Sequence, residues 1–148
     1  MLDGWFEAPT GRPYITGRLV FPRLGIDEHV SFCIDTGADM TSLMPGDGRS
    51  LGVEYSRLRG RQQTIGVGGR ADNYTERALL LFTEPRRGIH VYRLGLTIAA
   101  LSPGILTLPS LLGRDVINRW RIDYHPTKGR LRCHVVSADV VVPLRGPR

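Results

Sequence analysis

One apolar segment of this 148-residue chain ends directly in a carboxylate, and this feature limits the folds that the chain can adopt. Residues 31–34 have the composition of a buried strand, and Asp35, Thr36 and Gly37 follow at once and force a turn. An acid at the tip of an apolar strand is costly unless hydrogen bonds or a partner hold it. Carboxylates in such places are candidates for acid–base chemistry. The alternative is an Asx-turn, in which Asp35 caps its own backbone.

The length and the charge of the chain point to one domain without an evident nucleic-acid site. With 148 residues, 41% of them hydrophobic, the chain is long enough to bury a core. The net charge is +6, but the arginines are scattered and the aromatic residues, 7% of the chain, do not alternate with them. A stacking platform for bases is therefore not expected, and we predict no nucleic-acid partner.

The cysteines and the longest uncharged segment indicate a protein of the cytoplasm. Cys33 and Cys133 lie in apolar runs and read as buried free thiols, with a disulfide between them as the open alternative. Residues 94–113 carry no charge over twenty positions, which is the length of a bilayer span. Pro103 and Pro109 interrupt any such helix, so two buried strands around a turn fit better and no membrane partner is expected.

The pattern along the chain predicts an all-β domain over residues 13–142, between an N-terminal arm (1–12) and a C-terminal tail (143–148). Short β-rich runs alternate with Gly- and Pro-rich turns, which is typical of a closed all-β fold. Pro45 to Gly48 should end one apolar run, and residues 111–120 should hold the single short helix. We expect strands or strand-like runs at 14–21, 30–34, 41–43, 78–83, 89–96, 98–101, 105–108, 121–124, 131–136 and 140–142.

Three separate motifs, taken in order, resemble those of one family. They are Asp35-Thr36-Gly37-Ala38-Asp39, Ile65-Gly66-Val67-Gly68-Gly69 and Leu111-Leu112-Gly113-Arg114-Asp115. Together they resemble the retropepsins, which are single-domain aspartic proteases of retroviruses with cellular and bacterial relatives. The resemblance covers residues 14–123, and the layout is closest to the longer bacterial members. It implies the closed acid-protease barrel, with no cofactor and no metal.

The resemblance implies that Asp35 is the catalytic residue of an aspartic endopeptidase. Amide hydrolysis needs one carboxylate to take a proton from water and one acid to protonate the carbonyl oxygen, and two close carboxyls that share a proton supply both. This chain has a single Asp-Thr-Gly. The partner must therefore be Asp35 of a second copy, so we expect a symmetric homodimer.

Supporting roles follow for the residues around Asp35. Thr36 is expected to hydrogen-bond across the dyad, and Gly37 to allow the tight turn. Ala38 lacks the hydroxyl that two-lobed relatives use to hold the ionised carboxylate, which predicts usable activity at mildly acidic pH. Asp39 and Arg114 should form a network beneath the site, with Arg114 as a scaffold residue.

Two further charged residues near these motifs have expected roles. Asp115 is expected at the N-terminus of the short helix, where the helix dipole favours an acid. Arg18 is a candidate to meet Asp39 of the partner subunit across the dimer.

Residues 64–70 form the predicted flap, a hairpin that closes over an extended peptide substrate. Its substrate-binding residues would be Ile65, Gly66, Val67, Gly68 and Gly69. Ile65 stands where viral flaps usually carry another glycine. A phosphate-binding loop is disfavoured, since no Gly-Lys-Ser/Thr and no helical stretch follow the glycines.

Two other function classes remain open from the sequence. The first is a catalytically silent dimeric peptide-binding or interaction module on the same scaffold, because a fold does not fix an activity. The second, more remote, is a basic RNA- or DNA-binding barrel. A metal centre is not expected, since the four histidines have no ligand spacing and no Cys-x-x-Cys occurs.

Overall fold

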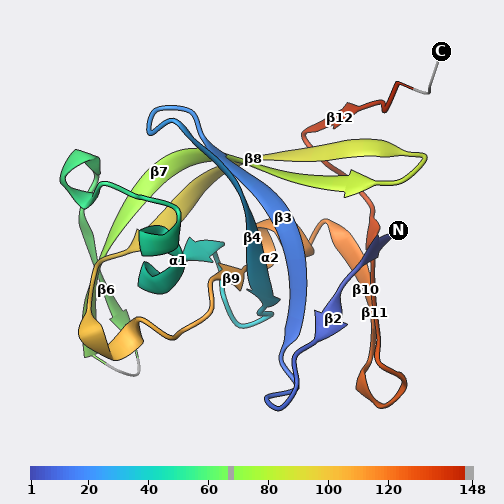
Figure 1. The fold of residues 1–148 in the computed structure, drawn as a ribbon, viewed down its shortest axis with the longest axis horizontal. Coiled ribbons are helices and arrows are strands. Elements are labelled where there is room, and N and C mark those ends of the chain that lie inside the picture. The colour runs from blue at the N-terminus through green and yellow to red at the C-terminus, as the bar shows by residue number, and fades with distance from the viewer. Residues whose placement is uncertain (67–68, 146–148) are drawn as a thin grey trace.

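A ring of hydrogen-bonded strands organises the computed structural model, which describes residues 1–66 and 69–145 (Figure 1). The ring follows the order β8-β5-β9-β4-β3-β7, and pairing between β7 and β8 closes it. The strands and α-helices, in chain order, are β1 (Leu2–Asp3), β2 (Trp5–Phe6), β3 (Pro13–Phe21), β4 (Ile26–Ile34), β5 (Ser42–Leu43), α1 (Pro45–Ser50), β6 (Gln62–Gly66), β7 (Gly69–Glu84), β8 (Gly88–Ala99), β9 (Leu111–Leu112), α2 (Arg114–Ile117), β10 (Trp120–His125), β11 (Arg130–Val135) and β12 (Val140–Val142).

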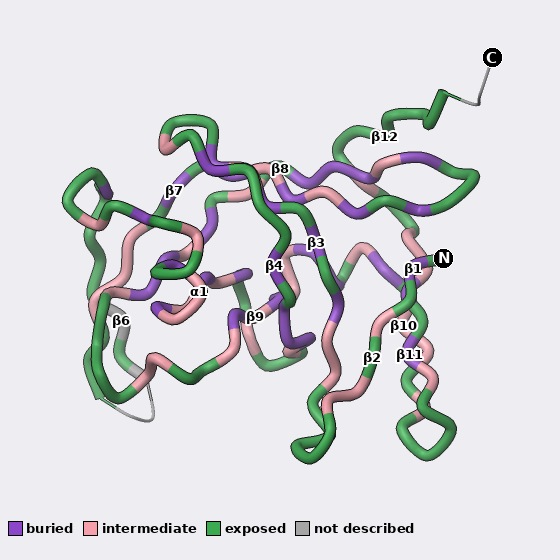
Figure 2. The backbone as a smooth tube through the Cα atoms, in the orientation of Figure 1, coloured by how far each residue is buried: buried purple, intermediate pink, exposed green. Residues whose placement is uncertain are grey.

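The all-β fold class is confirmed, and the alternation of side chains along the strands explains it. In β3 and β4 every second residue turns inward, so that Leu19, Phe21, Val30 and Phe32 are buried. Side chains from β7, β8 and α2 fill the same core. Figure 2 shows the buried positions gathered along the crossing strands, with exposed positions at the turns. The antiparallel pairing of β3 with β4 extends from Tyr14↔Cys33 to Phe21↔Ile26.

A smaller sheet lies beside the ring. It has the order β1-β11-β10, in which Leu2 pairs with Cys133 and Trp120 pairs with Val135. The first residues, expected as a loose arm, are therefore partly ordered: Leu2 is buried and β2 pairs with the start of β3. Cys133 is a free, buried thiol, and burial raises its pKa to about 12. No helix in the described ranges is long and apolar enough to cross a membrane.

Two segments differ from their predicted structure. Residues 45–48 were expected to break the chain, but Pro45–Ser50 is a short helix with proline in its first turn, where proline is tolerated. Its glycines allow close packing, since a Cβ on Gly46 would lie 2.3 Å from the backbone oxygen of Leu106. Residues 105–108 are not a strand, because a 3₁₀ turn (Pro103–Ile105) precedes them and the chain crosses the surface. The domain thus has two short α-helices where one was predicted.

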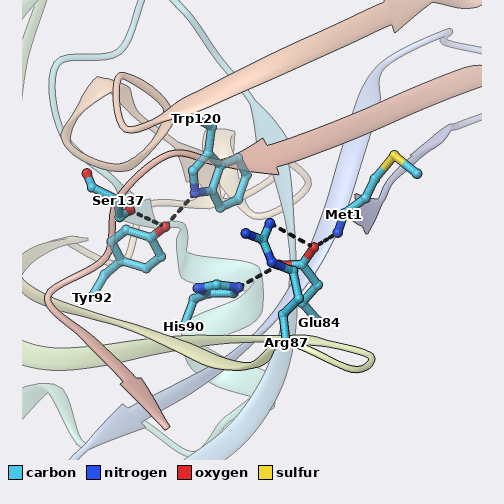
Figure 3. A network of polar contacts seen from close by, with 7 residues as sticks. All are labelled: Met1, Glu84, Arg87, His90, Tyr92, Trp120 and Ser137. Carbon is cyan, nitrogen blue, oxygen red and sulfur yellow. Dashed lines mark hydrogen bonds and ion pairs between the residues drawn. The ribbon is translucent and has the colours of Figure 1, made fainter. Parts of the chain in front are cut away.

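A buried cluster of polar side chains joins the end of β7 to the rest of the fold (Figure 3). The carboxylate of Glu84, 1% exposed, forms an ion pair with the Met1 ammonium and contacts His90 Nε2 at 2.7 Å. Arg87 lies 3.8 Å from the same carboxylate. Because Met1 and Arg87 already supply two positive charges, a third is unfavourable. Burial and these charges lower the pKa of His90, so the ring is neutral at pH 7.

A second set of polar contacts adjoins this cluster. The Trp120 indole N–H donates to the Tyr92 hydroxyl at 2.6 Å, and that hydroxyl donates to the Ser137 carbonyl at 2.9 Å. Phe82 packs edge-on against both rings. Buried aromatic residues with polar groups usually find such partners. These contacts fix the chain that follows β11 onto β8.

Candidate active site

Asp35 lies directly beyond β4, held by backbone pairing to β9. The amide of Cys33 donates to the Ser110 carbonyl at 2.8 Å, and the amide of Asp35 donates to the Leu112 carbonyl at 3.1 Å. The parallel pairing of Ile34 with Leu112 lies between these two bonds. The ends of two strands that are far apart in sequence therefore place the Asp35 carboxylate.

The side chain of Asp35 also shapes its own loop. Its Oδ1 accepts a hydrogen bond from the Gly37 amide at 2.8 Å, which is the Asx-turn considered as the alternative reading. A Cβ on Gly37 would lie 3.2 Å from that oxygen, so the turn favours glycine. The other oxygen, Oδ2, makes no hydrogen bond within the described residues. The half-buried carboxylate thus has one oxygen fixed and one without a partner among residues 1–66 and 69–145.

Arg114 holds the loop after Asp35 from below. Its Nη1 donates to the Thr36 carbonyl at 2.8 Å, and its Nη2 forms an ion pair with Asp39 Oδ1. Its backbone amide donates to the Ala38 carbonyl at 2.8 Å. The structure therefore brings Asp39 and Arg114 together as the motif spacing suggested. Asp39 is 81% exposed, so solvent screens this pair and its main effect is to orient the loop.

Thr41 and Asp115 form a second brace that the sequence did not reveal. Asp115 lies in the first turn of α2, as expected, but its carboxylate accepts from the Thr41 amide at 3.0 Å and from the Thr41 hydroxyl at 2.7 Å. The same hydroxyl accepts from the Gly113 amide at 3.1 Å. A Cβ on Gly113 would lie 2.5 Å from Met40, so glycine alone fits. In the sequence, only the Gly113-Arg114-Asp115 run pointed to this region, and it does not indicate that Thr41, 74 residues earlier, is the partner of Asp115.

The glycine-rich hairpin is present as far as the structure describes it. Gly66 pairs with Gly69 and Ile65 pairs with Arg70 in antiparallel register. Val67 and Gly68 lie outside the described residues, so their expected part in the flap stays a prediction. Gly69 has φ +108°, a conformation that suits glycine. Ile65 is 79% exposed, which leaves an apolar side chain uncovered beside the turn.

Cys33 is a packed thiol on the same strand face as Asp35. It is free and 9% exposed. Burial, with the negative charge of Asp35 as a second cause, raises the pKa of its thiol and disfavours the thiolate. A nucleophilic role for Cys33 therefore has no support, and the disulfide left open from the sequence is not formed.

The register of β3 changes which arginine lies next to the site. Arg18, the predicted cross-dimer residue, pairs instead with Asp27 of its own hairpin through bonds of 2.7 and 2.6 Å. The β3–β4 ladder ends with Tyr14 opposite Cys33, so Arg12 and Asp35 both lie just beyond this end of the hairpin. Arg12 lines a polar cavity of about 520 Å³. Its walls come from β2, β3, α1 and residues 106–109.

Comparison with known proteins supports the fold through structure alone. No family model matches the sequence, and no curated protein sequence matches it. A retropepsin-like aspartic protease from Rickettsia conorii superposes with a TM-score of 0.51 at 20% identity, covering 86% of this chain and 94% of that one. EIAV protease, in complex with the inhibitor HBY-793, gives a TM-score of 0.51 at 19% identity, with coverages of 76% and 90%. The chain has the retropepsin-like aspartic protease fold.

Proposed function

We propose that this protein is an aspartic endopeptidase whose reaction centre forms when two copies pair. The observation that carries the proposal is the state of the Asp35 carboxylate. One oxygen is fixed by Gly37 and the other has no partner within the described part of its own chain. The chain contains one Asp-Thr-Gly, so a second carboxylate of this kind has to come from a second copy. The retropepsin-like fold supports the same assignment.

The proposed chemistry needs only the two Asp35 side chains and one water. Two adjacent carboxyls share a single proton, because two negative charges at this distance repel strongly. The ionised member takes a proton from water, the resulting hydroxide attacks the carbonyl carbon, and the protonated member gives its proton to the carbonyl oxygen. The tetrahedral intermediate then collapses: the carboxyl that took the water proton gives it to the nitrogen, the other carboxylate takes a proton from a hydroxyl of the intermediate, and the C–N bond breaks.

The surrounding residues take supporting roles in this proposal. Thr36, exposed at the tip of the loop, would hydrogen-bond across the two-fold axis. Asp39 and Arg114 would keep the loop in position, and the hairpin of β6 and β7 would close over an extended peptide. Arg12 replaces Arg18 as the arginine positioned to meet Asp39 of the partner subunit, since Arg18 is already paired.

The decisive experiment compares the wild type with Asp35→Asn on a peptide library at about pH 5–6, in the mildly acidic range expected for this site. Asp123→Asn is the matched control, because it makes the same change at a partly exposed aspartate of the smaller sheet, where Asp123 pairs with Arg130. We expect wild type and Asp123→Asn to cleave, pepstatin-type inhibitors to suppress the cleavage, and Asp35→Asn to be inactive. Equal cleavage by Asp35→Asn would contradict the proposal.

A mixing experiment tests the shared site directly. If each active unit needs one Asp35 from each copy, mixed dimers with Asp35→Asn are inactive. Activity per total protein should then fall with the square of the wild-type fraction, to about one quarter in an equal mixture after subunit exchange. A linear fall to about one half would show that each copy works alone. Sedimentation measures the oligomeric state of the same samples.

The exposure of Ile65 supports a second candidate function, peptide binding without catalysis. Ile65 is 79% exposed at a hairpin position that would approach the peptide backbone. A bulky side chain there favours binding over turnover, as in a dimeric peptide-binding module without catalysis. In that case both wild type and Asp35→Asn would bind peptides with equal affinity and neither would cleave them.

A further inference from the structure

A second surface feature lies on the outer face of β7 and β8, away from the Asp35 loop. It is a groove of about 630 Å³, which is the size of many small-molecule sites. Its floor is mostly aliphatic and two arginines stand at its rim. The lining residues are Pro22, Thr75, Arg77, Ala78, Leu79, Arg93, Leu94 and Gly95. In Figure 1 the two strands run side by side across the molecule, and the turn between β3 and β4 that carries Pro22 lies beside them.

Gly95 has no side chain to fill the groove, and packing inside the domain does not require a glycine at this position. A glycine inside a strand weakens it and often marks a close approach by a ligand or by another backbone. The other mid-strand glycine of the ring, Gly17, is required by packing, since its Cβ would lie 2.9 Å from Leu80. A Cβ on Gly95 would meet only the Thr75 methyl group, at 3.3 Å. The pairing around Gly95 is regular, so no bulge accounts for it either.

The two arginines at the rim are placed to act on one anion. Arg77 pairs in register with Gly95, and Arg93 pairs with Leu79, so the arginines are diagonal neighbours on one face. Such neighbours have Cα atoms roughly 7–8 Å apart, a distance that long side chains span easily. Two guanidinium groups on neighbouring strands repel each other, and an anion bound between them would offset that repulsion.

Nearby carboxylates are already used by other groups. Asp139 accepts from the Arg93 backbone amide with Oδ2 and from Arg119 with Oδ1, both at 2.7 Å. Glu76 is buried and bound by Arg23 through bonds of 2.8 and 2.7 Å. Asp27 forms an ion pair with Arg18. Within the described residues, neither the Arg77 guanidinium nor that of Arg93 has an ion pair.

We propose that the groove binds an amphipathic carboxylate, with the carboxylate between Arg77 and Arg93 and an aliphatic body over Gly95 and Leu79. The arginines supply charge-assisted hydrogen bonds to the head group. The aliphatic floor removes the chain of the ligand from water. This binding function is separate from the proposed proteolysis and does not depend on it.

The test uses decanoate as the probe and the full chain as the protein. Calorimetry measures affinity, and amide NMR shifts locate the site. We expect saturable binding with shifts confined to residues 75–79 and 93–95, and much weaker binding of decanol, which has no charge. Asp35→Asn should bind decanoate as the wild type does. Shifts centred on the Asp35 loop, equal affinity for decanol, or no binding would each overturn the proposal.

Two variants separate charge from shape. Arg77→Gln/Arg93→Gln should weaken decanoate binding by about tenfold or more, because each charge-assisted bond is lost. Gly95→Val should remove binding by filling the hollow; valine suits a strand, and a Cβ at this position meets only the Thr75 methyl group, at 3.3 Å. Arg121→Gln, on the exposed face of β10, is the control for a lost charge and should bind normally. Melting curves confirm that each variant is folded, and unchanged affinity in both groove variants would contradict the proposal.

Discussion

The surroundings of Glu84 and of Asp39 show two different uses of an acidic side chain in one small fold. Glu84 is 1% exposed and faces the Met1 ammonium, Arg87 and His90, all within its own chain. Asp39 is 81% exposed and has Arg114 alone as its ion-pair partner within the described residues. Charge at the Glu84 end is therefore neutralised internally and serves stability. Beside the Asp35 loop, the charge of Asp39 stays open to solvent.

Removing the buried carboxylate of Glu84 should have the largest effect on the free energy of unfolding. Glu84→Gln should lower the free energy of unfolding by about 3 kcal/mol, because it removes a buried charged group that contacts both the Met1 ammonium and His90. Chemical denaturation measures the loss. A loss below about 1 kcal/mol would mean that water already screens this cluster and that the contrast with Asp39 is weak.

Loss of the hydrogen bonds between Asp115 and Thr41, beneath the Asp35 loop, should have the second-largest effect on stability. Asp115→Asn keeps the size of the side chain but removes the charge that accepts bonds from the amide and hydroxyl of Thr41. We expect a loss of about 2 kcal/mol of stability, in the range for hydrogen bonds to charged groups. Thr41→Val tests the hydroxyl alone and should cost less. An unchanged denaturation midpoint for Asp115→Asn would show that the loop does not need this brace.

The pH dependence of stability tests the state of His90. Its pKa is lowered in the folded protein, so the unfolded chain binds more protons between that lowered pKa and about 6.5. Stability should therefore fall as the pH drops below about 6.5, by a modest amount. His90→Gln should flatten this part of the profile, whereas His125→Gln, at the last residue of β10, should leave it in place. A profile of His90→Gln that is as steep as the wild type would assign the effect to another group.

The smallest stability effect should come from Asp39. Asp39→Asn should change the free energy of unfolding by no more than about 0.5 kcal/mol, since an exposed ion pair contributes little. Its effect should instead fall on dimer formation or on peptide hydrolysis if the proposed site is correct. Denaturation and sedimentation on the same preparation distinguish the two. A stability loss as large as that of Glu84→Gln would show that Asp39 contributes as much to folding as Glu84, and would contradict the comparison.

Local patterns predicted most of the strands and the candidate site. Alternation along 14–21, and the Asp35-Thr36-Gly37 run, placed the carboxylate at a strand end, where the structure has it. The pairing of Asp39 with Arg114 followed from the motifs and was confirmed. These features are encoded within a few residues or in motifs that carry their own spacing.

What the sequence did not reveal depends on contacts between distant segments. Pro45–Ser50 has the composition of a turn, yet it is helical where Gly46 packs against the Leu106 backbone. The bonds of Thr41 to Asp115 join positions 74 residues apart. The ion pair of Arg18 with Asp27 was not foreseen, because it depends on the register of the β3–β4 hairpin. No local rule gives these outcomes.

The unbroken length of β7 connects the regions compared above. This one strand begins at Gly69 in the glycine hairpin, passes Arg77 at the rim of the outer groove, and ends at Glu84 in the buried cluster. Its ladder with β8 is continuous from Asn73 to Glu84. One strand therefore joins the glycine hairpin, the outer groove and the surroundings of Glu84 through a single hydrogen-bonded ladder. Substitutions at Glu84 or Arg77 should accordingly be assayed for peptide hydrolysis as well as for stability or ligand binding.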